Sequence, residues 1–207
     1  MRHKEYGTAL NWNYVILSIV VLAVITLLLI YVPNIREIDR NVLGFVQSVL
    51  APFPYVIPNF VSTFGYANKM LWPQIAAGCV LVSHRHYLKA FLLIFFTQAT
   101  FVVAGFMKTA ICRQRPCGFS YPGYSFPSDH ASTAMCFYGI LIYLVLHYVK
   151  NDFWRIFLAT LFGIWIFLVA ISRMWLNVHF PLDVIGGIFL GVLLLNLFII
   201  TSRFFSR

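Results

Sequence analysis

Apolar residues in this chain fall into long runs, and most polar residues gather in the short segments between them. Six runs approach the roughly 20 residues that a helix needs to cross the hydrocarbon core of a bilayer. The expected spans are Trp12–Val32, Tyr66–Val82, Leu88–Thr109, Ala131–Val149, Phe153–Ile171 and Pro181–Thr201. We therefore predict an all-α, polytopic membrane protein with six transmembrane helices, and its length suits one domain over residues 1–207.

The first third of the chain is less regular. Asn68, Lys69 and Pro73 interrupt the second expected span. The segment Asn34–Phe60 mixes charged and apolar residues and contains several prolines, so we expect an interfacial amphipathic helix followed by a Pro-rich turn. The first apolar run exceeds the roughly 7–15 residues of a signal peptide and ends without a small-residue cleavage site, which predicts an uncleaved span.

The composition agrees with a membrane protein. Hydrophobic residues make up 61% of the chain and charged residues 10%, which leaves too little polar surface for a soluble domain. A net charge of +9 is compatible with nucleic-acid binding, but the basic residues occur in ones and twos between the spans. That distribution is typical of membrane anchoring, so we expect a membrane and no nucleic acid as a partner.

Lysine and arginine residues also predict the orientation. With the N-terminus inside, the inner segments hold Arg2, Lys4, Arg85, Lys89, Lys150, Arg155, Arg203 and Arg207. The outer segments hold Arg36, Arg40, Lys108, Arg113, Arg115 and Arg173. Lys108, Arg115 and Arg173 belong to the candidate chemistry described below. Without them the count is eight against three, which favours cytoplasmic N- and C-termini in an inner (plasma) membrane.

Three polar motifs lie at the ends of the last four spans. They are Lys108-x6-Arg115-Pro116, Pro127-Ser128-Asp129-His130 and Ser172-Arg173-x5-His179-x3-Asp183. Spans three and five end on the membrane face where spans four and six begin, so the motifs converge on one face in either orientation. The predicted orientation makes this the outer face, towards the periplasm or the cell exterior.

The residue types in these motifs favour binding of a phosphate. Two of the motifs precede or begin a helix, where free backbone N–H groups and the helix dipole attract anions. The expected phosphate-binding residues are Lys108, Arg115, Ser128, Asp129 and Arg173. His179, oriented by Asp183, is a candidate nucleophile towards phosphorus, and His130 is a candidate general acid for the departing oxygen.

Other interpretations of these residues compete. His179 and Asp183 could hold a metal, but the three neighbouring cations attract an anion instead, so no metal or cofactor is expected. Basic residues at span ends are usually interfacial anchors, which is our interpretation of Arg113, Lys150 and Arg155. A transporter would place ionisable residues near the bilayer midplane, where spans three to six have almost none. A catalytically silent scaffold would tolerate loss of the motif residues.

Together the motifs resemble the signature of the type-2 phosphatidic acid phosphatase superfamily, whose membrane members have six spans. Its pattern is Lys-x6-Arg-Pro, Pro-Ser-Gly-His and Ser-Arg-x5-His-x3-Asp, matched here within residues 108–183. The resemblance implies a metal-independent lipid phosphatase that passes through a phosphohistidine. It assigns His179 as nucleophile, Asp183 as the residue that orients it, and His130 as general acid.

Asp129 departs from this pattern, which has Gly at that position. An added carboxylate repels a phosphate unless it is paired, and His130, Arg113 and Arg115 are the available partners. The Pro-Ser-Asp-His form resembles the small bacterial undecaprenyl-diphosphate phosphatases linked to bacitracin resistance. We therefore expect hydrolysis of undecaprenyl diphosphate to undecaprenyl phosphate, with phosphatidylglycerophosphate and lipid A phosphatase activities as alternatives.

Two further features leave alternatives open. Cys112 and Cys117 flank Arg115 on the presumed outer face, where they could form a disulfide or remain free thiols. The spacing Gly187-x3-Gly191 allows close helix packing, either within one chain or in a dimer, and the oligomeric state is left open.

Overall fold

The computed structural model describes residues 8–65, 67–118 and 121–205, and all regular elements within them are helical. The elements are α1 (Thr8–Tyr31), α2 (Ile35–Leu50), α3 (Val56–Ser62), the short 3-10 helix η1 (Thr63–Gly65), α4 (Ala67–Ser83), α5 (Tyr87–Ile111), α6 (Asp129–Tyr148), α7 (Asp152–Trp175) and α8 (Pro181–Phe204). The predicted all-α class is thus confirmed for the described part of the chain. Tyr66, Arg2, Lys4 and Arg207, which entered the predictions above, lie outside the described residues.

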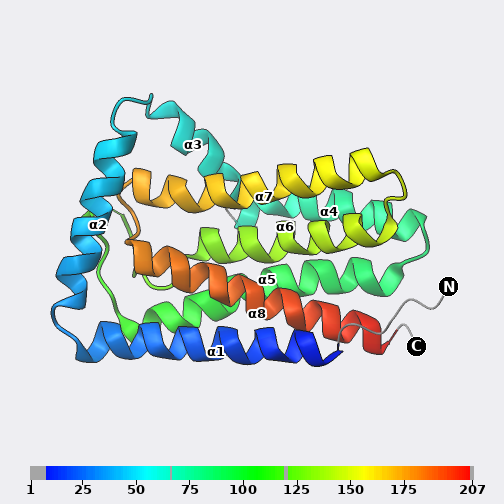
Figure 1. Cartoon of the computed structure of the whole chain (residues 1–207), viewed down its shortest axis with the longest axis horizontal. Helices are drawn as coiled ribbons and strands as arrows, with labels where there is room; N and C mark the ends of the chain where they lie inside the picture. Colours follow the sequence, from blue (N-terminus) through cyan, green and yellow to red (C-terminus); the bar gives the residue numbers. More distant parts are fainter. Residues whose placement is uncertain (1–7, 66, 119–120, 206–207) are drawn as a thin grey trace.

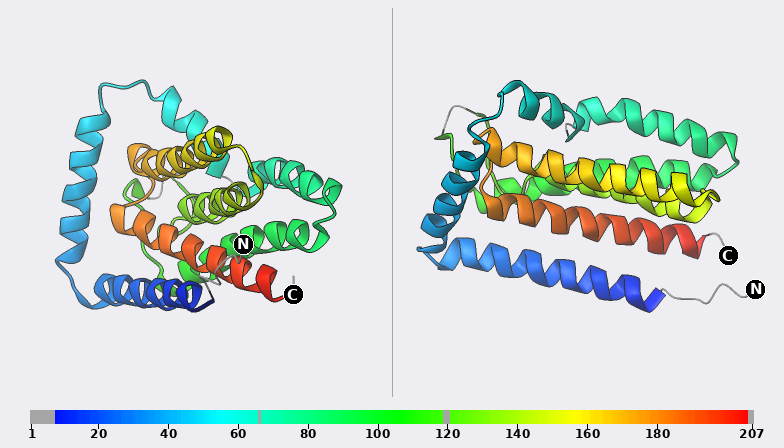
Figure 2. Two further views of the ribbon diagram at one scale, coloured as in Figure 1. Left: turned by 45° about the vertical axis from the view of Figure 1, so that its right-hand side comes forward. Right: turned by 45° about the horizontal axis from the view of Figure 1, so that its top comes forward.

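Helices α1 and α4 to α8 run along the long axis of the molecule, and α2 lies across one end of this bundle (Figures 1 and 2). Helices α5 and α7 end, and α6 and α8 begin, at the end of the bundle that α2 crosses (Figure 1). The helix ends that carry the three motifs therefore meet at one end of the bundle. Helix α1 begins and α8 ends at the opposite end (Figure 1).

Among the described residues, five helices are long and apolar enough to cross a membrane. These segments are Asn11–Tyr31 of α1, Tyr87–Ile111, Asp129–Tyr148, Asp152–Trp175 and Pro181–Phe204. Their surfaces carry large exposed apolar side chains, for example Ile19 and Ile30 on α1 and Phe167 on α7, which suit contact with lipid. The chain is therefore a membrane protein.

The first third differs in detail from the prediction. The second expected span corresponds to α4, which has only 17 residues and contains Pro73. The helix expected after the first span is present as α2. The Pro-rich turn is shorter than predicted, because α3 already begins at Val56.

Close packing between α6 and α8 holds two of the motifs together. A Cβ atom on Gly187 would lie 2.4 Å from the Ser128 carbonyl oxygen, and one on Gly191 would lie 2.6 Å from the Ser132 carbonyl oxygen. The Ser128 N–H also donates to the Asp183 carbonyl at 2.9 Å. The two glycines thus serve packing within one chain, and they fix the start of α6 against the start of α8.

Candidate active site

His179 lies in the short loop between α7 and α8, directly before Pro181 begins α8. The Asp183 side chain accepts the Phe180 backbone N–H at 2.8 Å, which ties the first turn of α8 to the loop. The same Asp183 oxygen lies 3.6 Å from His179 Nδ1, and both side chains are fully buried. The fold therefore places His179 next to Asp183, at a distance slightly longer than a hydrogen bond.

Arg115 determines which nitrogen of His179 carries the proton. Its Nη1 lies 3.1 Å from His179 Nε2, and the same nitrogen donates to the Val178 carbonyl at 2.9 Å. A guanidinium only donates, so His179 Nε2 is the acceptor and Nδ1–H faces Asp183. Burial is the largest influence on His179 and lowers its pKa to about 3; the nearby Lys108 and Arg173 act in the same direction, while Asp183 opposes them. His179 is thus a neutral imidazole with its lone pair on Nε2.

The start of α6 brings Asp129 and His130 to the same place. Ser128 caps this helix, since its side chain accepts the Ala131 N–H at 3.4 Å. Asp129 Oδ1 lies 3.4 Å from His130 Nδ1, 3.4 Å from Lys108 Nζ and 3.7 Å from His179 Nε2. Of the partners expected for Asp129, His130 is therefore in place and Lys108 joins it, while the neutral His179 lies nearby.

The remaining phosphate-binding candidates come from α5 and α7. Lys108 Nζ donates to the Tyr124 carbonyl at 3.0 Å, which directs it towards the loop between α5 and α6. Arg173 is only 2% exposed, and its Nη1 donates to the Ser62 hydroxyl of α3 at 2.8 Å. These bonds hold both cations in one orientation before any ligand binds.

A cavity of about 270 Å³ opens between these groups. Its lining includes Phe101, Gly105, Lys108, Arg115, Tyr121, Pro122, Gly123, Asp129, His130 and Arg173. Arg115 also lies over the Tyr121 ring, with its guanidinium carbon 4.6 Å from the ring centre. Five of the eight predicted site residues thus line one cavity, while Ser128, His179 and Asp183 are fully buried.

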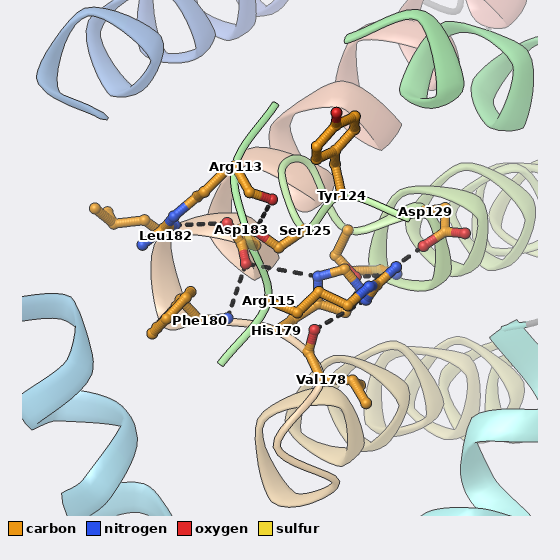
Figure 3. A network of polar contacts seen from close by, with 12 residues as sticks. Arg113, Arg115, Tyr124, Ser125, Asp129, Val178, His179, Phe180, Leu182 and Asp183 are labelled. Carbon is orange, nitrogen blue, oxygen red and sulfur yellow. Dashed lines mark hydrogen bonds and ion pairs between the residues drawn. The ribbon is translucent and has the colours of Figure 1, made fainter. Parts of the chain in front are cut away.

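Figure 3 shows a second network behind His179 that the sequence analysis missed. Arg113 is only 7% exposed, and its interpretation as an interfacial anchor is wrong. Its Nη1 contacts Asp183 and its Nη2 contacts Asp39 of α2, each at 2.6 Å. Asp39 also accepts the Leu182 backbone N–H at 3.0 Å. Arg113 therefore bridges two buried carboxylates. One of them, Asp183, lies beside His179 (Figure 3).

Burying the charged form of Asp39 at this position is energetically unfavourable. Burial raises its pKa, and the hydrogen bond and charge of Arg113 offset that rise only in part. A signal for Asp39 was available in the sequence, since Asp39 and Leu43 share the buried face of α2 at a spacing of four residues. A carboxylate on the buried face of an amphipathic helix needs a cationic partner.

The cysteines near the site are not bridged. Cys112 and Cys117 are both free thiols, which decides between the two alternatives left open by the sequence. Cys112 has a left-handed backbone with φ of 53° and ends α5, where its N–H donates to the Lys108 carbonyl at 2.9 Å. The chain turns at this point, so that Arg113 and Arg115 enter the interior.

Parts of this chain are similar in sequence to known proteins. Phosphatidylglycerophosphatase B of Bacillus subtilis (strain 168) is 42% identical over 72 residues, which cover 34% of this chain and 36% of that protein. The bacitracin transport permease protein BcrC of Bacillus licheniformis is 42% identical over 69 residues, which cover 33% of this chain and 29% of that protein. The matches thus span about a third of the length of these relatives.

The whole fold has a solved counterpart. The crystal structure of a transmembrane PAP2-type phosphatidylglycerolphosphate phosphatase from Bacillus subtilis superposes with a TM-score of 0.81 at 22% identity. The superposition covers 95% of this chain and 98% of the other. The sequence model of the PAP2 superfamily matches residues 86–207, which is more than half of the chain and includes all three motifs. The protein therefore belongs to the PAP2 superfamily.

Proposed function

We propose that this protein hydrolyses the phosphate of a membrane lipid through a phosphohistidine on His179. The observation that carries the proposal is the state of His179: a buried, neutral imidazole with Nδ1–H facing Asp183 and the Nε2 lone pair beside a cation-lined cavity. An imidazole held in this way is a nucleophile, and Asp183 stabilises the positive charge that develops as it reacts.

In the first step, Arg115 exchanges its hydrogen bond to His179 Nε2 for one to a phosphate oxygen, and Nε2 then attacks phosphorus and forms an N–P bond. The bond between phosphorus and the leaving oxygen breaks, and the electron pair stays on that oxygen. His130, which lines the cavity, donates a proton to the leaving group. Lys108, Arg115 and Arg173 bind the other phosphate oxygens and neutralise their charge in the transition state.

In the second step, water attacks the phosphohistidine. His130 has lost its proton in the first step and now accepts one from this water. The N–P bond breaks, His179 Nε2 recovers its lone pair, and inorganic phosphate is released. We propose that no metal takes part, because the cations that bind the phosphate already supply the positive charge that a metal would provide.

We further propose six membrane crossings within a single domain, with α3, η1 and α4 together forming the second crossing and α2 lying in the membrane interface.

The distribution of basic residues supports an orientation. Arg113 belongs to the site network, so Arg36 and Arg40 are the cations at the site end of the bundle that have no role in the site. The opposite end of the described bundle holds Arg85, Lys89, Lys150, Arg155 and Arg203. This asymmetry favours cytoplasmic termini and a site on the outer face.

For the substrate we propose undecaprenyl diphosphate. The support is the Pro127-Ser128-Asp129-His130 form of the second motif together with the local similarity to BcrC. A second candidate is phosphatidylglycerophosphate, which is favoured by the similarity to phosphatidylglycerophosphatase B.

The test is phosphate release by purified protein in detergent with EDTA, comparing the wild type with His179→Ala. Undecaprenyl diphosphate, phosphatidylglycerol phosphate and lipid A are offered side by side. Release that survives EDTA and is lost in the variant supports the phosphohistidine route, and the preferred lipid identifies the substrate. If folded wild-type protein releases phosphate from none of them, the proposal is wrong and a transporter or scaffold takes its place.

A further inference from the structure

The Asp129 carboxylate lies at the centre of the candidate site, between a lysine and the two histidines. A single oxygen, Oδ1, lies 3.4 Å from Lys108 Nζ, 3.4 Å from His130 Nδ1 and 3.7 Å from His179 Nε2. These three groups belong to the site that we propose for a phosphate. Asp129 was counted above among the phosphate-binding residues; we propose that it is instead an internal competitor of phosphate. Its carboxylate occupies the phosphate site in the resting protein and must leave it before a ligand enters.

Burial supports this role. The His179 side chain is fully buried, whereas the Asp129 side chain is 21% exposed and lines the cavity. A phosphate that approaches His179 Nε2 from the cavity therefore meets the Asp129 carboxylate first. Two anions at this place repel each other strongly because the surroundings are poorly hydrated, so binding of phosphate requires Asp129 to move away.

The charges of the cavity lining lead to the same conclusion. Lys108, Arg115 and Arg173 supply three positive charges around the cavity, and Asp129 is the carboxylate among its lining residues. A phosphate in their midst would be held tightly, and inorganic phosphate would then be a strong product inhibitor. The negative charge of Asp129 neutralises part of this positive charge, so free phosphate is bound less tightly.

The inference rests on the proposed function and deepens it. A lipid substrate is concentrated in the membrane and gains further binding energy from its chain, which helps it to displace the carboxylate. Inorganic phosphate has no such anchor, so Asp129 returns and helps to release it. Asp129 thus acts as a specificity-determining residue that favours lipid-linked phosphate over free phosphate.

The size of the effect follows from the occupancy of the internal ligand. If the carboxylate leaves the site less than about one-tenth of the time, the apparent affinity for phosphate is weakened at least roughly tenfold. Removing the carboxylate should therefore strengthen phosphate binding by the same factor. We therefore expect at least a tenfold lower dissociation constant for inorganic phosphate in Asp129→Asn.

In the experiment, the purified protein in detergent is titrated with inorganic phosphate. Binding is measured by calorimetry and by the shift in melting temperature. This binding assay does not depend on catalytic turnover. Asp129→Asn is compared with Asp129→Gly, which removes the side chain, and with Asp129→Glu, which keeps a carboxylate. The matched control is Asp152→Asn: Asp152 is 77% exposed, pairs with Arg155 at 2.7 Å and begins α7 at the other end of the bundle.

The proposal is supported if Asn and Gly at position 129 tighten phosphate binding at least tenfold while Asp129→Glu and Asp152→Asn stay near the wild type. Either of the first two variants that retains a cooperative melting transition is sufficient. Unchanged or weaker binding in these variants overturns the inference and leaves the proposed function intact, provided that the wild type still releases phosphate from lipid. Absence of both phosphate binding and lipid hydrolysis would overturn the two together.

Discussion

The contact between Asp39 and Arg113 offers the sharpest test of how the fold supports the site. Asp39 belongs to α2 and lies one step behind the candidate catalytic residues, since Arg113 connects it to Asp183. The Asp39→Asn substitution keeps the size of the side chain but removes its charge. The amide of the substituted side chain retains an oxygen that can accept the Leu182 N–H, so the change isolates the ion pair.

The magnitude follows from burial and distance. The Arg113 and Asp39 side chains are 6% and 2% exposed, and their closest atoms lie 2.6 Å apart. Breaking a buried ion pair costs roughly 3–5 kcal/mol, but Arg113 keeps Asp183 as a partner and the burial of Asp39 is itself unfavourable. We therefore expect a loss of about 2–3 kcal/mol, close to that of one charged hydrogen bond. For a protein of 207 residues this lowers the melting temperature by roughly 4–12 °C.

Activity should decrease as well, through kcat rather than KM. Arg113 without Asp39 has freedom to pull Asp183 away from His179, and a nucleophile displaced by about 1 Å can lose on the order of 100-fold in rate. The assays are thermal unfolding in detergent and steady-state phosphate release. The exposed Asp152→Asn variant serves as control and should differ little from the wild type. A melting temperature within about 2 °C of the wild type, with unchanged kcat, would refute the reasoning.

The other predictions concern packing, protonation and catalysis. Gly187→Ala should destabilise by roughly 1–3 kcal/mol because its Cβ meets the Ser128 carbonyl, whereas Gly163→Ala, with nothing within 4 Å, should be neutral or stabilising; melting temperatures compare them. His179 has a pKa of about 3 when folded against 6.5 as its ordinary value, so unfolded chains take up its proton first. Its contribution to stability is therefore lost as the pH falls from about 6.5 towards 3, by up to about 1.4 kcal/mol per unit. Melting curves of His179→Gln should show a weaker dependence over this range, and an identical one would contradict the buried neutral state. His130→Ala should reduce hydrolysis of a diphosphate less than that of a monoester, since a phosphate leaves with less acid help; equal losses in kcat would exclude His130 as the donor.

Much of the fold could be predicted from the sequence because the bilayer restricts it. A chain that crosses hydrocarbon must satisfy its backbone within helices, so apolar runs give both the elements and their lengths. The run expected over Leu88–Thr109 became Tyr87–Ile111, and that over Pro181–Thr201 became Pro181–Phe204. The rule was weakest at α4, where Pro73 and Lys69 leave a helix of 17 residues that length alone does not identify as a span.

The site was predictable where its residues recur at fixed spacing or where the order of the spans brings their helix ends to one face. His179 and Asp183 are four residues apart, so the start of α8 brings them together: the Asp183 carboxylate caps the Phe180 N–H and lies beside His179 in the preceding loop. Asp39 and Arg113 are separated by 74 positions, and Ser62 and Arg173 by 111. No periodicity records such contacts, because they depend on how α2 and α3 pack over the end of the bundle. Arg113 was misinterpreted for this reason: a lone arginine after an apolar helix has the same local pattern whether it anchors the helix at the interface or enters the interior.

These long-range contacts show that the two halves of the chain contribute differently to the site. All the motif residues lie in the second half, yet two buried cations of that half are held by the first half: Arg113 by Asp39 and Arg173 by Ser62. A buried guanidinium is stable only if it is paired, and a cation that binds phosphate must hold its position before the ligand arrives. Asp183 cannot supply both partners of Arg113, because its second oxygen already accepts the Phe180 N–H and faces His179. The helix across the end of the bundle is therefore part of the site, and the motif segment depends on it for the geometry that the chemistry requires.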